Sequence, residues 1–158
     1  MTDVFVVDTS IVVQSLIQDT YSANTDILFA QYKTFDRLWV PEFCHLECIN
    51  VLWKQVRFHG MPQAQAEQAI KDLHGLPLKV ADVSVLYVRA FQIGVANKLA
   101  VYNAVYIALA EFLTYPLITV DEAQQRAALA EKISIKSKLI SKPLRNLGIR
   151  RLEYIAIL

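Results

Sequence analysis

Short apolar runs alternate along the chain with longer segments in which apolar residues recur at helical spacing. The first run, Val4–Val7, consists of β-branched and aromatic residues and ends at Asp8, a pattern typical of a strand buried on both faces. Three further runs are also short enough to be strands. They are Arg37–Val40, Leu76–Val80 and Pro116–Val120.

The segments between these strands show helical periodicity, with proline or glycine near several of their ends. One predicted helix begins at Asp82 or Ser84 and ends at Gly94. The others are Ile11–Ile17, Ala23–Tyr32, Pro41–His59, Pro62–Leu73 and Asn103–Leu113. Because strands and helices alternate, the pattern predicts an α/β fold, a three-layer α/β/α sandwich with a central, mostly parallel sheet.

The last thirty residues are less regular and strongly basic. Ile133–Ile135 and Leu152–Ile157 are strand candidates, while Lys136–Gly148 is either a loop or a short helix. Residues 126–151 carry a single acidic residue, Glu131, and many basic ones. The basic residues are Arg126, Lys132, Lys136, Lys138, Lys142, Arg145, Arg150 and Arg151. This basic C-terminal segment could contact the phosphates of a nucleic acid, or it could be an ordinary solvated surface.

The composition indicates one domain with a partner. The 158 residues contain no repeat, low-complexity stretch or linker, which predicts a single domain over residues 1–158. Hydrophobic residues make up 54% of the chain, so we expect a second copy or another protein to cover part of the surface. No apolar run approaches the roughly 18 residues of a membrane span, and Asp3 and Asp8 do not suit a signal peptide. We therefore expect no membrane association and a cytoplasmic location.

Three acidic residues lie where a parallel sheet would gather them. Asp8 and Asp121 each follow a predicted strand, and Glu47 lies a turn or two inside the helix entered through Pro41. Neighbouring carboxylates repel by about 4 kcal/mol at 4 Å for an effective dielectric of about 20. Such a cluster implies a divalent cation or a bound proton, and oxygen-only ligands favour magnesium or manganese over zinc.

Four segments of the chain resemble the PIN-domain family and, within it, the ribonuclease toxins of VapBC-type toxin–antitoxin systems. They are Val6–Ser10, Pro41–Leu52, Val101–Ala110 and Leu117–Glu122, which follow one another in the family's order and span about three quarters of the chain. No one motif is specific, so the resemblance rests on the ordered set. It implies a PIN-like fold, metal-dependent hydrolysis of RNA, a homodimer, and an antitoxin that inserts a segment into the catalytic groove.

The resemblance also implies which residues form the site. The family's acidic quartet, which holds magnesium or manganese, falls on Asp8, Glu47, Asn103 and Asp121. The polar positions that the family places around the metal fall on Ser10, Asn50 and Thr119. Glu42 enters the same helix and is the alternative to Glu47, which is preferred because Asn50 follows it at the family's spacing.

Asn103 departs from the family's pattern, which usually has aspartate there. An amide has nearly the shape of the acid without its charge, so we expect weaker metal binding, with a second cation lost first. Three explanations are open: a natural member with one metal and reduced activity, a natural inactive member kept for binding, or an introduced change that permits expression of a toxic nuclease. A catalytically weakened or inactive PIN module that binds RNA or a protein is therefore the alternative to the enzyme.

Other chemistries fit the sequence less well. Cys44, His45 and Cys48 do not supply four zinc ligands, so both cysteines are predicted to be core residues. Tyr102 and Tyr106 could stack on bases, but a role in the core or in a dimer is favoured.

Overall fold

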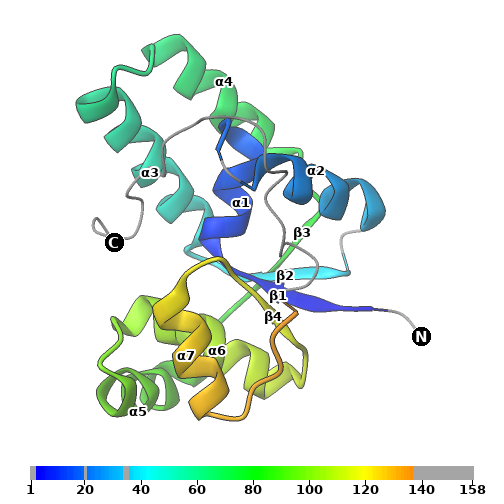
Figure 1. The fold of residues 1–158 in the computed structure, drawn as a ribbon, viewed down its shortest axis with the longest axis vertical. Helices are drawn as coiled ribbons and strands as arrows, with labels where there is room; N and C mark the ends of the chain where they lie inside the picture. Colours follow the sequence, from blue (N-terminus) through cyan, green and yellow to red (C-terminus); the bar gives the residue numbers. More distant parts are fainter. Residues whose placement is uncertain (1–2, 20, 34–35, 137–158) are drawn as a thin grey trace.

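A four-stranded parallel sheet forms the middle layer of the part of the chain that the structure describes (Figure 1). The structure is a computed structural model, and it describes residues 3–19, 21–33 and 36–136. The strands lie in the order β3-β2-β1-β4, and every neighbouring pair is parallel. They are β1 (Phe5–Val7), β2 (Leu38–Pro41), β3 (Leu78–Ala81) and β4 (Leu117–Ile118).

Helices cover both faces of this sheet, which confirms the predicted three-layer α/β/α architecture. In Figure 1, helices α1 to α4 lie on one side of the strands and α5, α6 and α7 lie on the other. The first group consists of α1 (Thr9–Leu16), α2 (Ser22–Gln31), α3 (Cys44–His59) and α4 (Gln63–His74). The second consists of a short 3-10 turn η1 (Ser84–Leu86), α5 (Tyr87–Asn97), α6 (Val101–Leu113) and α7 (Glu122–Ala130).

Helix α6 is the most deeply buried helix of the described chain. Every residue from Asn103 to Ala110 is buried, and the helix packs against β1, β2 and β4. Burying large apolar side chains such as Ile107 and Leu109 stabilises the fold by about 1.5–3 kcal/mol each. This packing brings the polar side chains of Asn103 and Tyr106 into the interior together with the apolar ones.

The start of α3 differs from the prediction. Pro41 is the last residue of β2 instead of the first residue of a helix, and α3 begins at Cys44. The reason is that the pairing with β3 continues to the end of β2: Pro41 lies opposite Ala81, and the Glu42 N–H donates to the Ala81 carbonyl at 3.0 Å. The sheet therefore holds this segment extended for longer than the helical pattern indicates.

The end of α5 also differs from the prediction, because Gly94 does not stop the helix. The helix continues to Asn97, and Lys98 adopts the left-handed conformation with φ 53°. A Cβ atom at Gly94 would lie 2.9 Å from the Leu99 carbonyl oxygen. Glycine is thus required here for the close approach of the chain that leads into α6, and not as a helix terminator.

Little of the basic C-terminal segment falls within the described residues. Arg126, Lys132 and Lys136 are exposed, and Ile135 forms a single parallel bridge with Leu117 at the edge of the sheet. The strand candidate at residues 152–157, the ambiguous segment beyond residue 136 and the other basic side chains lie outside the described residues.

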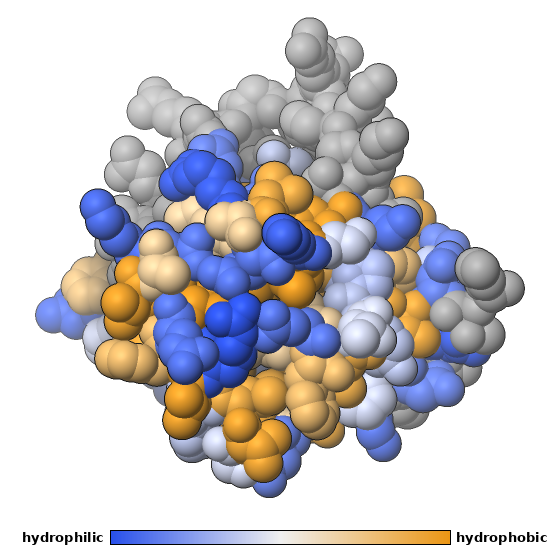
Figure 2. Space-filling view, turned by 90° about the horizontal axis from the view of Figure 1, so that it is seen from below, coloured by the Kyte–Doolittle hydropathy of each residue, from blue (hydrophilic) through white to orange (hydrophobic). Residues whose placement is uncertain are grey.

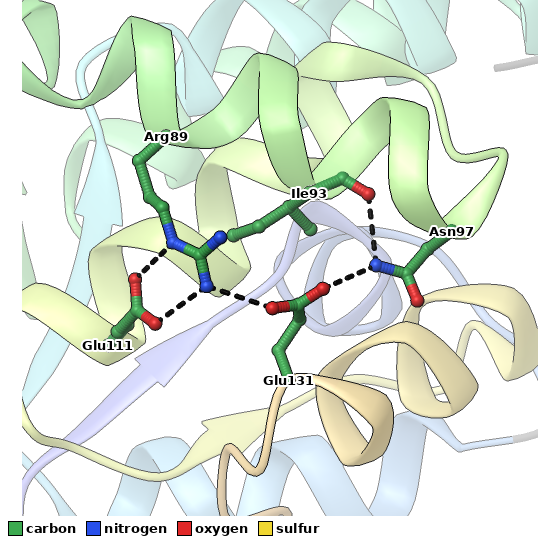
Figure 3. A network of polar contacts seen from close by, with 5 residues as sticks. All are labelled: Arg89, Ile93, Asn97, Glu111 and Glu131. Carbon is green, nitrogen blue, oxygen red and sulfur yellow. Dashed lines mark hydrogen bonds and ion pairs between the residues drawn. The ribbon is translucent and has the colours of Figure 1, made fainter.

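A polar network ties together the three helices on the α6 side of the sheet (Figure 3). Arg89 on α5 donates two hydrogen bonds to Glu111 on α6, at 2.7 and 2.8 Å, and a third to Glu131 just after α7, at 2.8 Å. Asn97 donates to Glu131 at 2.7 Å and to the Ile93 carbonyl at 2.9 Å. The single cation is therefore shared between two carboxylates, which leaves no unpaired charge on α5.

Within the described ranges, no single helix is long and apolar enough to cross a membrane. The segments Ser84–Asn97 and Val101–Leu113 reach that length and composition only together, and they are bent by 116° relative to each other.

Candidate functional site

Asp8 and Asp121 lie at the same edge of the sheet, because β1 and β4 are parallel neighbours and each aspartate follows its strand. Each also caps the helix that follows. Asp8 Oδ2 accepts a hydrogen bond from the Ser10 N–H at 3.0 Å, and Asp121 Oδ1 accepts one from the Gln124 N–H at 2.8 Å. Both carboxylates therefore face the N-terminal end of a helix, where negative charge is favoured.

Asp8 is a buried acid that pairs with no cationic side chain in the described part of the chain. Its side chain is 3% exposed, and none of the ion pairs among the described residues includes it. Burial raises the pKa of Asp8, the hydrogen bonds from Ser10 and Gln124 lower it, and the nearby charge of Asp121 raises it again. A carboxylate held in this way is a favourable partner for a cation.

Two hydroxyl groups connect the aspartates. Thr119 Oγ1 donates to Asp8 Oδ2 at 3.3 Å and accepts from the Asp121 N–H at 3.0 Å. Ser10 Oγ lies 3.4 Å from Thr119 Oγ1 and accepts from the Val120 N–H at 3.3 Å. Ser10 and Thr119 thus fix the connection between β4 and α7 against Asp8.

Gln124, in the first turn of α7, is a member of this network that the sequence analysis missed. Its side chain is 1% exposed, and its amide nitrogen donates to Asp8 Oδ1 at 3.2 Å and to the main-chain oxygen of Asn103 at 3.0 Å. Its carbonyl oxygen, Oε1, is buried and has no hydrogen-bond partner among the described residues. An unpaired buried acceptor is unusual, because burying it without a donor costs free energy.

Glu47, in the first turn of α3, is held by two side chains that the sequence analysis did not assign to the site. Thr9 Oγ1 donates to Glu47 Oε2 at 2.7 Å, and the Tyr106 hydroxyl donates to the same oxygen at 2.6 Å. The Thr9 and Tyr106 oxygens are themselves 2.6 Å apart. Tyr106 is fully buried, which agrees with the core role favoured from the sequence, and it also orients an acid.

The environment of Glu47 favours its protonated form. Burial raises its pKa to about 7, which outweighs the hydrogen bonds from Tyr106 and Thr9 that lower it; the charge of Asp8 adds to the increase. The three oxygens also make three short contacts with one another. When Glu47 is ionised, only the hydroxyl protons of Thr9 and Tyr106 are available for these three contacts. A protonated Glu47 supplies a third proton, so each contact can then be a hydrogen bond.

Of the remaining residues discussed in the sequence analysis, Asn103 is connected to Asp8, Asn50 is not, and the two cysteines lie in the core. Asn103 lies in the first turn of α6, and the hydrogen bond from Gln124 ties it to Asp8 through its main-chain oxygen. Asn50 is exposed on α3 and takes no part in these hydrogen bonds. Cys44 and Cys48 are buried and free of disulfides, as expected for core residues, with Cys44 Sγ 3.6 Å from Thr9 Oγ1.

The side chains at the carboxyl ends of β1 and β4 are of the types that bind a hard divalent cation. The acids there do not form a complete set of ligands, however. No three His, Cys, Asp or Glu side chains in the described chain are arranged as a metal site. Glu47 Oε2 accepts hydrogen bonds from Thr9 and Tyr106, and whether Glu47 also binds a cation stays a prediction. The Asp8 and Asp121 carboxylates and the unpaired Gln124 oxygen are the ligand types that magnesium and manganese prefer.

The residues that the sequence analysis missed lie at simple spacings from those that it found. Thr9 directly follows Asp8, Tyr106 lies three residues after Asn103, and Gln124 lies three residues after Asp121. Residues three apart share a helix face. A search of the first turn after each predicted acid position would therefore have singled out Tyr106 and Gln124 as polar neighbours, although not the side chains on other elements that they contact.

No protein-family model and no curated protein matches the sequence. Solved structures that resemble it include PAE2754 from Pyrobaculum aerophilum, with a TM-score of 0.67 and 22% identity over 89% of this chain and 95% of that chain. They also include FitAcB from Neisseria gonorrhoeae, with a TM-score of 0.55 and 13% identity over 83% of this chain and 95% of that chain. The chain therefore has the α/β/α PIN-like fold that the resemblance of its four segments predicted.

Proposed function

We propose that this protein is a magnesium- or manganese-dependent endoribonuclease and the toxin of a toxin–antitoxin pair. The observation that carries the proposal is the buried Asp8 carboxylate, which pairs with no described cationic side chain, lies near Asp121 and contacts the amide of Gln124, whose oxygen has no donor among the described residues. The toxin role and the antitoxin partner rest on the resemblance of the four segments to VapBC-type toxins. The PIN-like fold supports both.

Each residue of the edge has a role in this proposal. Asp8 and Asp121 would hold the cation, and Asn103 would be a weaker ligand or would hold a water. The chemistry that a divalent cation would supply there is polarisation of the phosphate and a lower pKa of a bound water. Thr119 and Ser10 orient Asp8, while Thr9 and Tyr106 hold Glu47 at the side of the site.

Cleavage of a structured RNA pool by the purified chain, in manganese and in chelator, tests the proposal. We expect cleavage in manganese only, and we expect Asn103→Asp to increase it by about tenfold because a fourth carboxylate strengthens metal binding. Asn103→Gln, which lengthens the amide without adding charge, is the control. Equal activity of the wild-type protein in manganese and in chelator would contradict the proposal.

A PIN module that binds RNA or a protein without cleaving is the second candidate. Two observations favour it: an amide replaces the third acid, and the described acids do not form a ligand group. Such a module would still bind RNA in the presence of chelator, and its Asn103→Asp variant would not cleave RNA. The two candidates therefore differ in one assay.

We propose further that the protein is a homodimer formed through the outer face of α5. Val88, Phe91 and Val95 are 72%, 59% and 65% exposed at helical spacing, and Val85 extends this stripe by one turn. Figure 2, which views the molecule from the α5–α7 side, shows hydrophobic patches beside hydrophilic ones. The one charged side chain of α5, Arg89, is paired with two carboxylates, so two copies can meet here without burying a free charge.

We expect Phe91→Glu to convert the dimer to a monomer, raising its dissociation constant at least about 30-fold because a charge would be buried at the centre of the interface. Sedimentation equilibrium measures this effect. Ile27→Glu on α2, which changes a similarly exposed residue on the opposite side of the sheet, should leave the dimer intact. A monomeric wild-type protein at the highest soluble concentration would contradict the prediction.

A further inference from the structure

We propose that Gln124 is a cation ligand of this site, with its amide nitrogen fixing Asp8 and its carbonyl oxygen binding the divalent cation. This inference rests on the proposed function, since it takes the cation site at Asp8 and Asp121 as given. Gln124 belongs to none of the positions that the resemblance assigns. Its role follows from its contacts alone.

The orientation of the Gln124 amide is fixed by its neighbours. The nitrogen lies 3.2 Å from Asp8 Oδ1 and 3.0 Å from the main-chain oxygen of Asn103, and both are acceptors. Exchanging the amide nitrogen and oxygen would set an oxygen against two oxygens, so the alternative orientation is excluded. Oε1 is therefore the atom that has no hydrogen-bond donor among the described residues.

The unpaired oxygen has the chemistry of a cation ligand. It is buried, it has no donor among the described residues, and the amide that carries it touches Asp8. A negative carboxylate and a carbonyl oxygen side by side attract positive charge, and hard cations accept both as ligands. No described cationic side chain pairs with either group.

Gln124 also lies on the element that carries the second aspartate. Its main-chain N–H donates to Asp121 Oδ1 at 2.8 Å, so one residue contacts Asp8 through its side chain and Asp121 through its backbone. Gln124 thus links the two acids through its hydrogen bonds. It supplies a further neutral oxygen to a site in which Asn103 has replaced a charged one.

Manganese binding, measured by the electron paramagnetic resonance of free Mn²⁺, separates this role from a purely structural one. Gln124→Leu removes both the oxygen and the donor, and we expect its Mn²⁺ dissociation constant to rise at least about tenfold. Gln124→Glu keeps an oxygen ligand and adds charge, and we expect it to bind Mn²⁺ as tightly as the wild type or more tightly. In chelator it should melt at a lower temperature, because its carboxylate lies against Asp8.

Gln14→Leu is the matched control, since Gln14 is another buried glutamine, whose side chain bonds Asp19 and Tyr21 instead of the site. It should lose stability without any change in Mn²⁺ affinity. If Gln124→Leu binds Mn²⁺ with an affinity within twofold of the wild type, the inference about Gln124 is wrong and the proposed function still stands. The same conclusion follows if Gln124→Glu binds Mn²⁺ as weakly as Gln124→Leu. A wild-type protein that binds no Mn²⁺ would overturn the proposed function as well.

Discussion

Asp8→Asn is expected to reduce manganese-dependent RNA cleavage by at least about 100-fold while the protein remains folded. The substitution keeps the size of the side chain and removes the negative charge that would hold the cation. The fold should tolerate it, because an amide oxygen can still accept from the Ser10 N–H and so cap α1. Initial cleavage rates at saturating manganese, with circular dichroism as the check on folding, measure the two effects.

Asp72→Asn is the control for this substitution. Asp72 is an exposed aspartate on α4, away from the site in the sequence, and its side chain accepts a surface hydrogen bond from Gln68. Its cleavage rate should equal that of the wild type. Wild-type cleavage by Asp8→Asn would exclude Asp8 from the catalytic machinery.

The contribution of Glu47 to the free energy of unfolding is expected to fall by about 2 to 3 kcal/mol as the pH rises from about 4.5 to about 7. Its pKa is raised from 4.5 to about 7 in the folded protein by burial. The folded state therefore keeps a proton that the unfolded state releases, so this contribution is fully present below pH 4.5 and is lost as the pH passes 7. The raised pKa of Asp8 acts in the same direction.

Glu47→Gln should remove most of this slope and should stabilise the protein at pH 8, because the neutral amide keeps the shape of the protonated acid. Urea denaturation at several pH values in chelator gives the unfolding free energies. Glu42→Gln, a change at the exposed acid next to β2, should retain the wild-type slope. A slope that persists in Glu47→Gln would mean that another group takes up the proton.

The strands were predictable from the sequence because their cause is local. Runs such as Val4–Val7 are apolar without interruption, as required of a strand covered on both faces, and Phe5, Val6 and Val7 are all buried. The two wrong boundaries, the start of α3 and the end of α5, lie where contacts with a segment outside the helix determine the backbone conformation. The pairing with β3 keeps Pro41 extended, and the path of the chain at Leu99 requires Gly94.

The same distinction applies to the site. Asp8 and Asp121 could be found because a carboxylate directly after a strand is a local feature, and the parallel arrangement then brings the two together. Thr9, Tyr106 and Gln124 were missed because their role depends on which side chains meet across β1, α3, α6 and α7. Sequence spacing alone does not contain these contacts. Whether Asn103 and Asn50 act in the site stays a prediction.

The pairing of β1 with β4 has a consequence for the order of events during synthesis. Val6 lies opposite Leu117, so the first strand cannot gain its second neighbour until more than a hundred further residues have been made. Contacts of such high sequence separation form late and slow the folding of a domain. Thr119, Asp121 and Gln124 reach Asp8 only through this pairing. A nascent or truncated chain that lacks β4 and α7 therefore carries Asp8 without these partners, so the carboxyl ends of β1 and β4 are assembled into one site only after residue 124 has been made.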